Sequence, residues 1–349
     1  MRFIGNKENL LVFLDSIVTS LDVVTGTFCD FFSGTANVGR YFKEKGFRII
    51  SSDIMYFSYV LQYAYIKNNK IPSFNILLNQ IEVKEHGFFD SPIDKVIHFL
   101  NRLDPVDGFI YQNYTDEGND KRKYFLPYNG KKIDAIRMII QAWYEKKVIS
   151  ENEYYILLAT LIESVPFYAN ISGVYAAYLK TYDPRAIKPF KLRPIKLYES
   201  KKEHQIFNVN SLKLLPKLDV DILYLDPPYN SRQYGPNYHI LETIALYDNP
   251  VVKGVTGLRN TNDKKSEFCN KDLALKTLDK IASEARYRYL LLSYNSEGIM
   301  PRELIIKTLS KYGNVELIEN DYRRFKSNSN GEANHRKFIK EQVYLLTHF

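Results

Sequence analysis

Hydrophobic and polar positions alternate along this chain in two different ways. Short apolar runs bounded by turn-forming residues, a pattern typical of buried strands, occur at 47–55, 204–210, 220–229, 288–296, 315–320 and 342–349. Apolar residues at helical spacing occur before and between them, at 8–20, 56–69, 237–248 and 271–285. Strands that alternate with helices in this way predict an α/β domain with a largely parallel sheet.

The middle of the chain breaks this alternation. Helical patterns occur there without comparable strands, around 131–148 and 151–166. The end of this block, 180–202, has eight basic side chains against two acidic ones and several prolines, which indicates an extended surface segment. We therefore predict one α/β domain, formed by 1–72 and 203–349, with a mainly helical insert at 73–202.

Composition and charge narrow the class of protein only modestly. The 349 residues are 45% hydrophobic and 25% charged, which is ordinary for a globular protein with an ample core. No run of about 18 apolar residues predicts a membrane span, and the charged start does not resemble a signal peptide. Cys29 and Cys269 have no metal or disulfide spacing, so we expect a cytoplasmic protein. A net charge of +8 permits an anionic partner without identifying one.

The first stretch with recognisable chemistry is DFFSGTANVG, at 30–39. Gly34 and its small neighbours Ser33 and Ala36 would let a cofactor approach the backbone where a helix begins. A phosphate-binding P-loop is excluded, because no Gly-Lys-Ser/Thr follows, and Ala36 stands where a full GxGxxG has its middle glycine. The alternative is a tight structural turn.

Asp53 ends the next predicted strand, 47–55. An acid about 20 residues beyond a glycine-rich turn is placed to hold a ribose diol. The alternative is an N-cap for the helix predicted at 56–69.

The third stretch is LYLDPPYN, at 223–230. Pro227 and Pro228 lack backbone N–H donors and hold the chain stiffly after the strand, so that one carboxylate, Asp226, and one ring, Tyr229, are presented together. A strand end with an N-cap aspartate is the alternative. Together the three stretches place polar loops at the carboxyl edge of one sheet, where open α/β folds bind ligands. No metal-ligand spacing accompanies them.

With these three stretches the chain resembles an S-adenosylmethionine-dependent DNA adenine-N6 methyltransferase of the D12 type. This family includes Dam-like enzymes and many type II modification methylases. RFIGNKENLL resembles its N-terminal cofactor motif, DFFSGTANVG its glycine-rich motif and LYLDPPYN its catalytic DPPY motif. Their order resembles the α arrangement, and ESVPFYANISGVYAAYLK resembles type IIS modification methylases. The resemblance covers 1–72 and 203–349 and implies a Rossmann-like methyltransferase sheet with an inserted target-recognition domain.

The resemblance also implies roles for individual residues. Lys7 would meet the methionine carboxylate of S-adenosylmethionine, Asp53 would hold the ribose hydroxyls, and Asn210, where an Asp is more usual, would lie beside the adenine. The methionine portion would contact Asp30, Phe32 and Gly34, and the catalytic turn would be Asp226, Pro227, Pro228 and Tyr229. Asp226 and the Pro227 carbonyl would accept hydrogen bonds from the target amine, with Tyr229 stacked on the flipped base.

The expected partner is double-stranded DNA with one flipped adenine, and a cognate restriction endonuclease would belong to the same system. We expect the insert to read DNA, helped by the basic segment 322–337. Its predicted phosphate and base contacts are Lys188, Lys191, Arg193, Arg122, Gln112 and Asn113.

The sequence leaves three alternatives to this function. The same type of turn could serve another amino group: cytosine N4, an RNA base or a protein glutamine. A catalytically silent DNA-binding specificity subunit is disfavoured by the intact Lys7, Asp226 and Tyr229. A nicotinamide dehydrogenase is disfavoured by the degenerate glycine pattern and by the DPPY turn.

Overall fold

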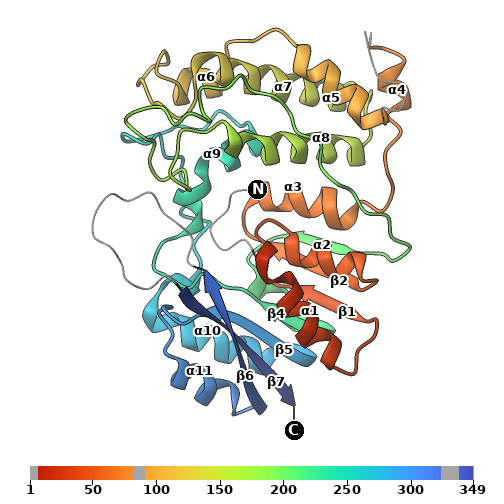
Figure 1. Cartoon of the computed structure of the whole chain (residues 1–349), viewed down its shortest axis with the longest axis vertical. Helices are drawn as coiled ribbons and strands as arrows, with labels where there is room; N and C mark the ends of the chain where they lie inside the picture. Colours follow the sequence, from red (N-terminus) through yellow and green to blue (C-terminus); the bar gives the residue numbers. More distant parts are fainter. Residues whose placement is uncertain (1–6, 82–90, 324–337, 349) are drawn as a thin grey trace. The chain divides into compact units, whose positions relative to one another are not determined.

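The structure, a computed structural model, describes residues 7–81, 91–323 and 338–348 (Figure 1). The chain divides into two compact units. One, here named the sheet unit, consists of 5–62, 200–235 and 262–349, and the other, the helical unit, contains 63–199 and 236–261. The helical unit thus includes the helical patterns of the predicted insert, together with a stretch that lies between the predicted strands 220–229 and 288–296.

A seven-stranded mixed sheet forms the centre of the sheet unit, in the order β3-β2-β1-β4-β5-β7-β6. Its strands are β1 (Thr27–Asp30), β2 (Arg48–Asp53), β3 (Gln205–Asn208), β4 (Asp219–Leu225), β5 (Arg286–Asn295), β6 (Gly313–Arg323) and β7 (Phe338–His348). The pairs from β3 through β5 are parallel, whereas β7 pairs antiparallel with both β5 and β6. The α/β prediction with a largely parallel sheet is confirmed.

Strand order places a topological switch point between β1 and β4. From β1 the chain continues outward to β2 and β3 on one side, and it returns to β4 on the other side. The two strands run parallel, with Asp30 beside Tyr224 in the register. Ligands of open α/β sheets bind outside the carboxyl ends of the strands at such a point.

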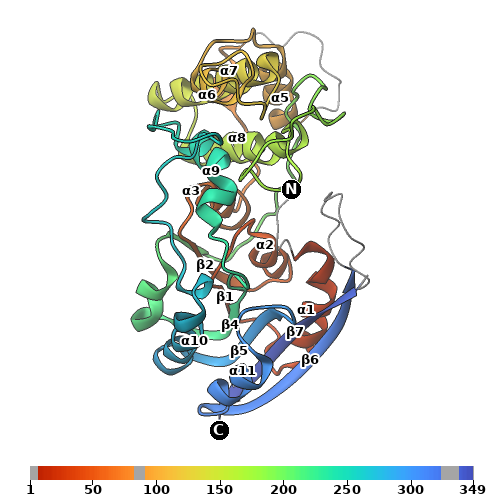
Figure 2. The same cartoon turned by 90° about the vertical axis from the view of Figure 1, so that its left-hand side faces the viewer.

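Side-chain alternation separates the two faces of the sheet. On one face Cys29, Leu223, Leu292 and Tyr344 pack with α10 (Lys271–Glu284) and α11 (Arg302–Leu309) in one apolar core. The residues next to them in each strand point to the opposite face, where α1 (Leu11–Ser20), α2 (Asn37–Glu44) and α3 (Tyr56–Gln62) lie (Figure 2). The short helices of this unit are η1 (Glu8–Leu10), η4 (Ser211–Lys217) and η5 (Glu267–Cys269).

The helical unit has no strand among its described residues. Its elements are η2 (Tyr63–Lys67), α4 (Asn75–Leu78), α5 (Pro92–Arg102), α6 (Phe109–Tyr114), α7 (Pro127–Glu145), α8 (Glu151–Ser164), η3 (Val165–Phe167) and α9 (Tyr234–Leu246), of which α9 belongs to this unit from Pro236 on. The predicted helices near 131–148 and 151–166 are confirmed as α7 and α8. Ser150 and Glu153 form a capping box at the start of α8, which fixes where that helix begins.

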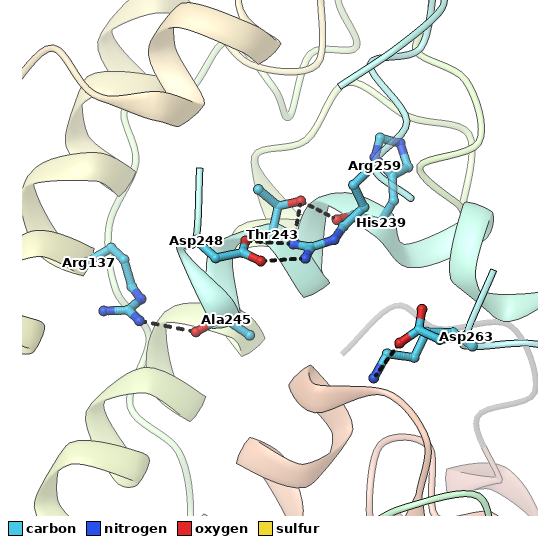
Figure 3. Close-up of polar contacts among 8 residues, drawn as sticks. Arg137, His239, Thr243, Ala245, Asp248, Arg259 and Asp263 are labelled. Carbon is cyan, nitrogen blue, oxygen red and sulfur yellow. Dashed lines mark hydrogen bonds and ion pairs between the residues drawn. The ribbon is translucent and has the colours of Figure 1, made fainter. Parts of the chain in front are cut away.

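A buried arginine connects two helices of this unit. Arg137 of α7 donates through Nε to the Ile244 carbonyl at 2.9 Å. One of its terminal nitrogens donates to the Ala245 carbonyl at 3.1 Å, a contact that Figure 3 shows. These carbonyls belong to the last turn of α9, whose acceptors have no partner within the helix. Arg259 holds the stretch after α9 in a similar way, with two nitrogens on the Asp248 carboxylate at 3.0 and 2.7 Å (Figure 3).

Candidate active site

The glycine-rich turn connects β1 to α2 at the switch point. Gly34 has φ of 51° and Ala36 has φ of 59°, so the turn uses the left-handed region twice. Glycine adopts that region without strain, and its missing side chain leaves the backbone open to a close approach. The Ser33 amide donates to the Ser52 carbonyl of β2 at 3.0 Å, which ties the turn to the neighbouring strand.

Asp30 ends β1 beneath this turn and is almost fully buried, with 1% of its surface exposed. One carboxylate oxygen accepts hydrogen bonds from the Gly39 amide at 3.0 Å and from the Ser33 hydroxyl at 3.3 Å. Burial raises the pKa of Asp30 to about 7, although the Gly39 amide favours the anion. This buried carboxylate therefore holds the turn and the start of α2 in place.

Asp53 ends β2 and contacts both the turn and the residue just before the next helix. One of its oxygens accepts from the Gly34 amide at 2.9 Å and the other from the Met55 amide at 2.8 Å. The second contact is with the residue directly before α3, so it orders the chain as it enters that helix. The capping role that the sequence analysis named as the alternative stays a prediction. The first contact places the carboxylate directly beside the glycine-rich turn, so the two features that the sequence spacing connected lie next to each other.

The DPPY turn follows β4 on the other side of the switch point. Pro227 and Pro228 are buried, and Asp226 keeps 20% of its side chain exposed. Burial raises the pKa of Asp226 to about 6 against the opposing effect of the Lys7 ammonium, whose Nζ lies 3.2 Å from Oδ1. Tyr229 packs against the apolar core of the sheet unit, and its carbonyl accepts from the Ile299 amide at 3.0 Å.

Lys7 lies between two carboxylates. Besides Asp226, its ammonium contacts Glu341 of β7, and both Lys7 and Glu341 are buried. Burial alone would lower the pKa of Lys7, but Asp226 and Glu341 together raise it above its ordinary value. The sequence analysis expected Lys7 at the methionine carboxylate, and that role stays a prediction. It did not single out Glu341, although a lone acid at the start of an apolar strand was a usable signal.

The two remaining cofactor candidates lie near the same edge of the sheet. Phe32 makes edge-to-face contacts with Phe31 and Phe268, at centroid distances of 5.0 and 5.4 Å. Asn210 caps η4 through the Leu212 amide, at 3.1 Å. Their contacts with a cofactor stay predictions. Phe32 follows β1 and Asn210 follows β3, so both lie at the carboxyl edge of the sheet that also carries Asp30 and Asp53.

The predicted DNA contacts lie in the helical unit and differ in exposure. Lys188, Lys191 and Arg193 are exposed, in a stretch of the chain without helix or strand. Gln112 is exposed on α6, whereas the amide nitrogen of Asn113 donates to the Phe109 carbonyl at 2.9 Å. The basic segment 322–337 lies outside the described residues from 324 on.

Arg122, the fourth basic candidate, is 3% exposed. Its guanidinium donates to the carbonyls of Asn113, Gly254 and Val255, at 3.0, 3.0 and 3.2 Å. It also pairs with the Asp120 carboxylate at 2.7 Å. These contacts use the guanidinium N–H groups that would have to donate hydrogen bonds to a base. The structure therefore gives Arg122 a structural role in holding the 254–255 loop.

The described ranges of the chain contain neither a candidate metal cluster nor a helix that could span a membrane. Within them, no group of three or more histidine, cysteine or acidic side chains is arranged to hold a metal ion. Likewise, no helix in those ranges has the length and apolar character needed to cross a membrane.

Sheet order, the glycine-rich turn and the DPPY turn together define a Rossmann-like methyltransferase, with its ligand edge at the β1–β4 switch point. Comparison with known families specifies the class further. The family model described as D12 class N6 adenine-specific DNA methyltransferase matches residues 3–307, and the chain belongs to this family.

Curated relatives carry names of the same kind. The chain is 37% identical over 339 residues to the type II methyltransferase M.NlaIII of Neisseria lactamica, covering 96% of both chains. It is 39% identical to the type II methyltransferase M.FokI of Planomicrobium okeanokoites, over 95% of this chain and 51% of that protein. It is 36% identical to the modification methylase LlaI of Lactococcus lactis, over 98% of this chain and 54% of that protein. The chain thus spans nearly all of the first relative and about half of the other two.

Proposed function

We propose that this protein is a site-specific DNA methyltransferase that transfers a methyl group from S-adenosylmethionine to N6 of adenine (EC 2.1.1.72). The observation that carries the proposal is the DPPY turn. It presents a partly exposed Asp226 carboxylate across the switch point from the glycine-rich turn, within one compact unit. Family membership and the names of the relatives support the same reaction.

The residues at the switch point fit S-adenosylmethionine. Gly34 offers a backbone without a side chain at positive φ, and Asp53 places a half-buried carboxylate beside it, suited to a pair of ribose hydroxyls. Phe32 adds an apolar ring at the same edge. When bound, S-adenosylmethionine supplies the methyl group from a sulfonium whose sulfur keeps the bonding electrons as a thioether.

The DPPY turn would prepare the target amine. The Asp226 carboxylate and the Pro227 carbonyl would each accept one N–H of the adenine N6 amine, which turns its lone pair out of the ring and toward the methyl donor. Holding reactants in this geometry lowers the barrier by about 7–11 kcal/mol in well-oriented systems. The anionic Asp226 would also stabilise the positive charge that develops on N6 before its extra proton leaves for solvent. Tyr229 would stack on the flipped base.

Methyl transfer measured on three substrate classes in parallel tests this function. The full chain is incubated with tritiated S-adenosylmethionine and DNA, RNA or protein, and the labelled nucleoside or residue is identified. Label in N6-methyladenine from DNA is expected. Label in N4-methylcytosine, in RNA or in glutamine would replace the proposal with one of the alternatives. No label with any substrate, under conditions in which cofactor binding is measured, would leave a silent DNA-binding subunit as the conclusion.

We further propose that the helical unit carries the DNA-recognition surface. Sequence readout has to come from outside the sheet and its cofactor edge, and the exposed Lys188, Lys191 and Arg193 suit phosphate contacts. Changing all three to Gln should weaken binding to every DNA sequence. It should also reduce the salt dependence by roughly 0.9 for each lost phosphate contact.

A matched control for this triple variant exists in the sheet unit. Lys271, Lys276 and Lys280 are equally exposed on α10 and carry the same total charge. Their replacement by Gln should leave the salt slope close to that of the wild type. If the two triple variants reduced the salt dependence of DNA binding equally, this dependence would follow net charge alone, and the proposed surface would be ruled out. Substitutions of Gln112 should instead change which site is methylated.

The named relatives include type II and modification methylases. We therefore extend the proposal to the modification half of a restriction-modification system. Genomic DNA from cells that express the chain should carry N6-methyladenine at one short sequence and resist an endonuclease of that specificity. Methylation scattered without sequence preference would contradict this extension.

A further inference from the structure

Glu341 is a buried acid that the proposed chemistry does not use directly. It lies on β7 with 4% of its surface exposed, and one of its oxygens accepts from the Lys7 ammonium and from the Ser293 hydroxyl, the latter at 3.1 Å. Burying a carboxylate is costly unless it is paired and hydrogen-bonded. Both conditions are met here, and the pairing cation is the one that also contacts Asp226.

The sheet places these groups on one face. In β7, Glu341 alternates with Gln342 and Tyr344, and Tyr344 points into the core beneath α10 and α11. Glu341 therefore points to the opposite face, and the same alternation sends Ser293 and Asp30 there. This arrangement brings an acid from near the end of the chain to a lysine near its start, 334 positions away.

We propose that Glu341 is a positioning residue that holds the Lys7 ammonium beside Asp226, so that Asp226 is ionised when it accepts the target amine. The inference rests on the proposed function, because it concerns the charge of the acceptor in that reaction. A lysine ammonium is a compact charge on a flexible stem of four carbons, so a single carboxylate fixes its position less closely than two do. Glu341 supplies that anchor from a strand of the sheet.

Glu341 acts on Asp226 in two opposite ways. As a nearby negative charge it raises the pKa of Asp226, and as the anchor of Lys7 it retains the cation that lowers this pKa. The other titratable groups that face this cluster are Asp30, Tyr224, Tyr229 and Glu297. They remain unchanged in every variant below, so the two effects of Glu341 can be separated by substituting it in two ways.

Two substitutions at this one position should shift the activity profile in opposite directions. Glu341→Gln keeps an oxygen that can accept from Lys7 but removes the negative charge that raises the pKa of Asp226. The acidic limb, the rise of kcat with pH as Asp226 ionises, should therefore move to lower pH. Glu341→Ala removes the anchor, so the acidic limb should move to higher pH by about 1 unit or more, as expected for a carboxylate that loses a close cation. Activity of the Ala variant should fall roughly five- to fifty-fold at pH 6 and recover at pH 9.

A variant of the cation supplies a second test. Lys7→Met should move the acidic limb in the same direction as Glu341→Ala. In the Lys7→Met background, Glu341→Ala can only remove repulsion, so it should move the limb back to lower pH. This reversal of sign depends on the anchoring role. If Glu341→Ala fails to fold, Glu341→Met, which fills more of the space but cannot accept from Lys7, replaces it in both backgrounds.

Glu319→Ala is the matched control. Glu319 lies in the same antiparallel β6–β7 pair but contacts Lys340 and Gln342 rather than Lys7. Its removal should leave the pH profile unchanged. A shift in this variant like that of Glu341→Ala would assign the effect to the strand pair and overturn the proposal.

A titration without substrate separates the inference from the proposed function. The Asp226 carboxyl is followed by ¹³C NMR in aspartate-labelled chain, with Asp226→Asn used to assign its signal. A higher pKa in Glu341→Ala together with a lower one in Glu341→Gln supports the inference even if no substrate is methylated. Downward shifts in both variants, or no shift in either, would overturn it even if the wild type methylates DNA.

Discussion

Replacing Asp226 by Asn removes one negative charge and keeps the shape of the side chain. Under the proposed mechanism the Asn oxygen can still accept one N–H of the target amine. A hydrogen bond to a charged group contributes about 1.5–3 kcal/mol and a neutral one about 0.5–1.5 kcal/mol, so roughly 1–1.5 kcal/mol is lost, which corresponds to about a five- to twelve-fold lower kcat. The loss of charge stabilisation in the transition state adds to this. Cofactor affinity should change little, since Gly34 and Asp53 are untouched.

The same substitution should make the protein more stable at alkaline pH. Burial raises the pKa of Asp226 from 3.8 to about 6, so ionising it costs the folded state about 3 kcal/mol more than the unfolded state. A raised carboxyl pKa gives stability that is complete below the unfolded value and is lost as pH rises through about 6. An Asn side chain stays neutral throughout, so at pH 8 the variant should unfold at higher denaturant concentration, by up to about 3 kcal/mol.

Urea unfolding at pH 8 and pH 4, together with methyl transfer at pH 8, measures both effects. The gain in stability should be present at pH 8 and small at pH 4. Asp279→Asn is the control: the Lys311 ammonium lowers the pKa of Asp279, so this substitution should give no gain at pH 8. An Asp226→Asn variant that is less stable than the wild type at pH 8, or that keeps activity within threefold, would refute the reasoning.

Three further substitutions have expected outcomes. Gly34→Val should destabilise the fold by about 1–2 kcal/mol, because a β-branched residue is strained at φ of 51°. Its side chain should also lower the cofactor affinity measured by calorimetry, and an unchanged affinity would exclude this turn from the cofactor site. Asp53→Ala should weaken cofactor binding more than it changes the urea midpoint, and the reverse order would leave Asp53 with a structural role only. Arg137→Met should destabilise the full chain by about 2–4 kcal/mol, because two buried carbonyls lose their donors; a change below 0.5 kcal/mol would contradict this account.

The sheet and its ligand edge could be predicted from the sequence because both depend on local signals. Apolar runs of strand length and helical spacing gave β2, β4 and β5 at nearly the observed positions. The small residues around Gly34 and the two prolines after Asp226 restrict the backbone at their own positions. The carboxyl edge then follows, because parallel strands end on the same side of a sheet.

Contacts between distant parts of the chain could not be predicted in the same way. Glu341 meets Lys7 only because β7 inserts antiparallel between β5 and β6, a pairing that no local pattern specifies. Arg122 lies in a polar, charged stretch that was interpreted as a surface reader of DNA. It is buried because the carbonyls of Gly254 and Val255 come to it from more than 130 positions away. A polar sequence therefore indicates partners for its side chains but does not say whether those partners are DNA or backbone.

Carboxyl groups with a raised pKa occur in both units, as Asp134 and Asp226, and the groups that they contact distinguish the two. Burial also raises the pKa of Asp134 in the helical unit to about 6, yet its oxygens accept from the Ile110 and Tyr111 amides and from the Tyr247 hydroxyl. Fixed neutral donors of this kind hold a loop in place and occupy most of the acceptor positions of the carboxylate. Asp226 instead faces the Lys7 ammonium, which Glu341 also holds, and it keeps 20% of its side chain exposed. A costly charge that is paired with a cation and still partly exposed is available to a reacting group, and packing alone gives no reason to retain it.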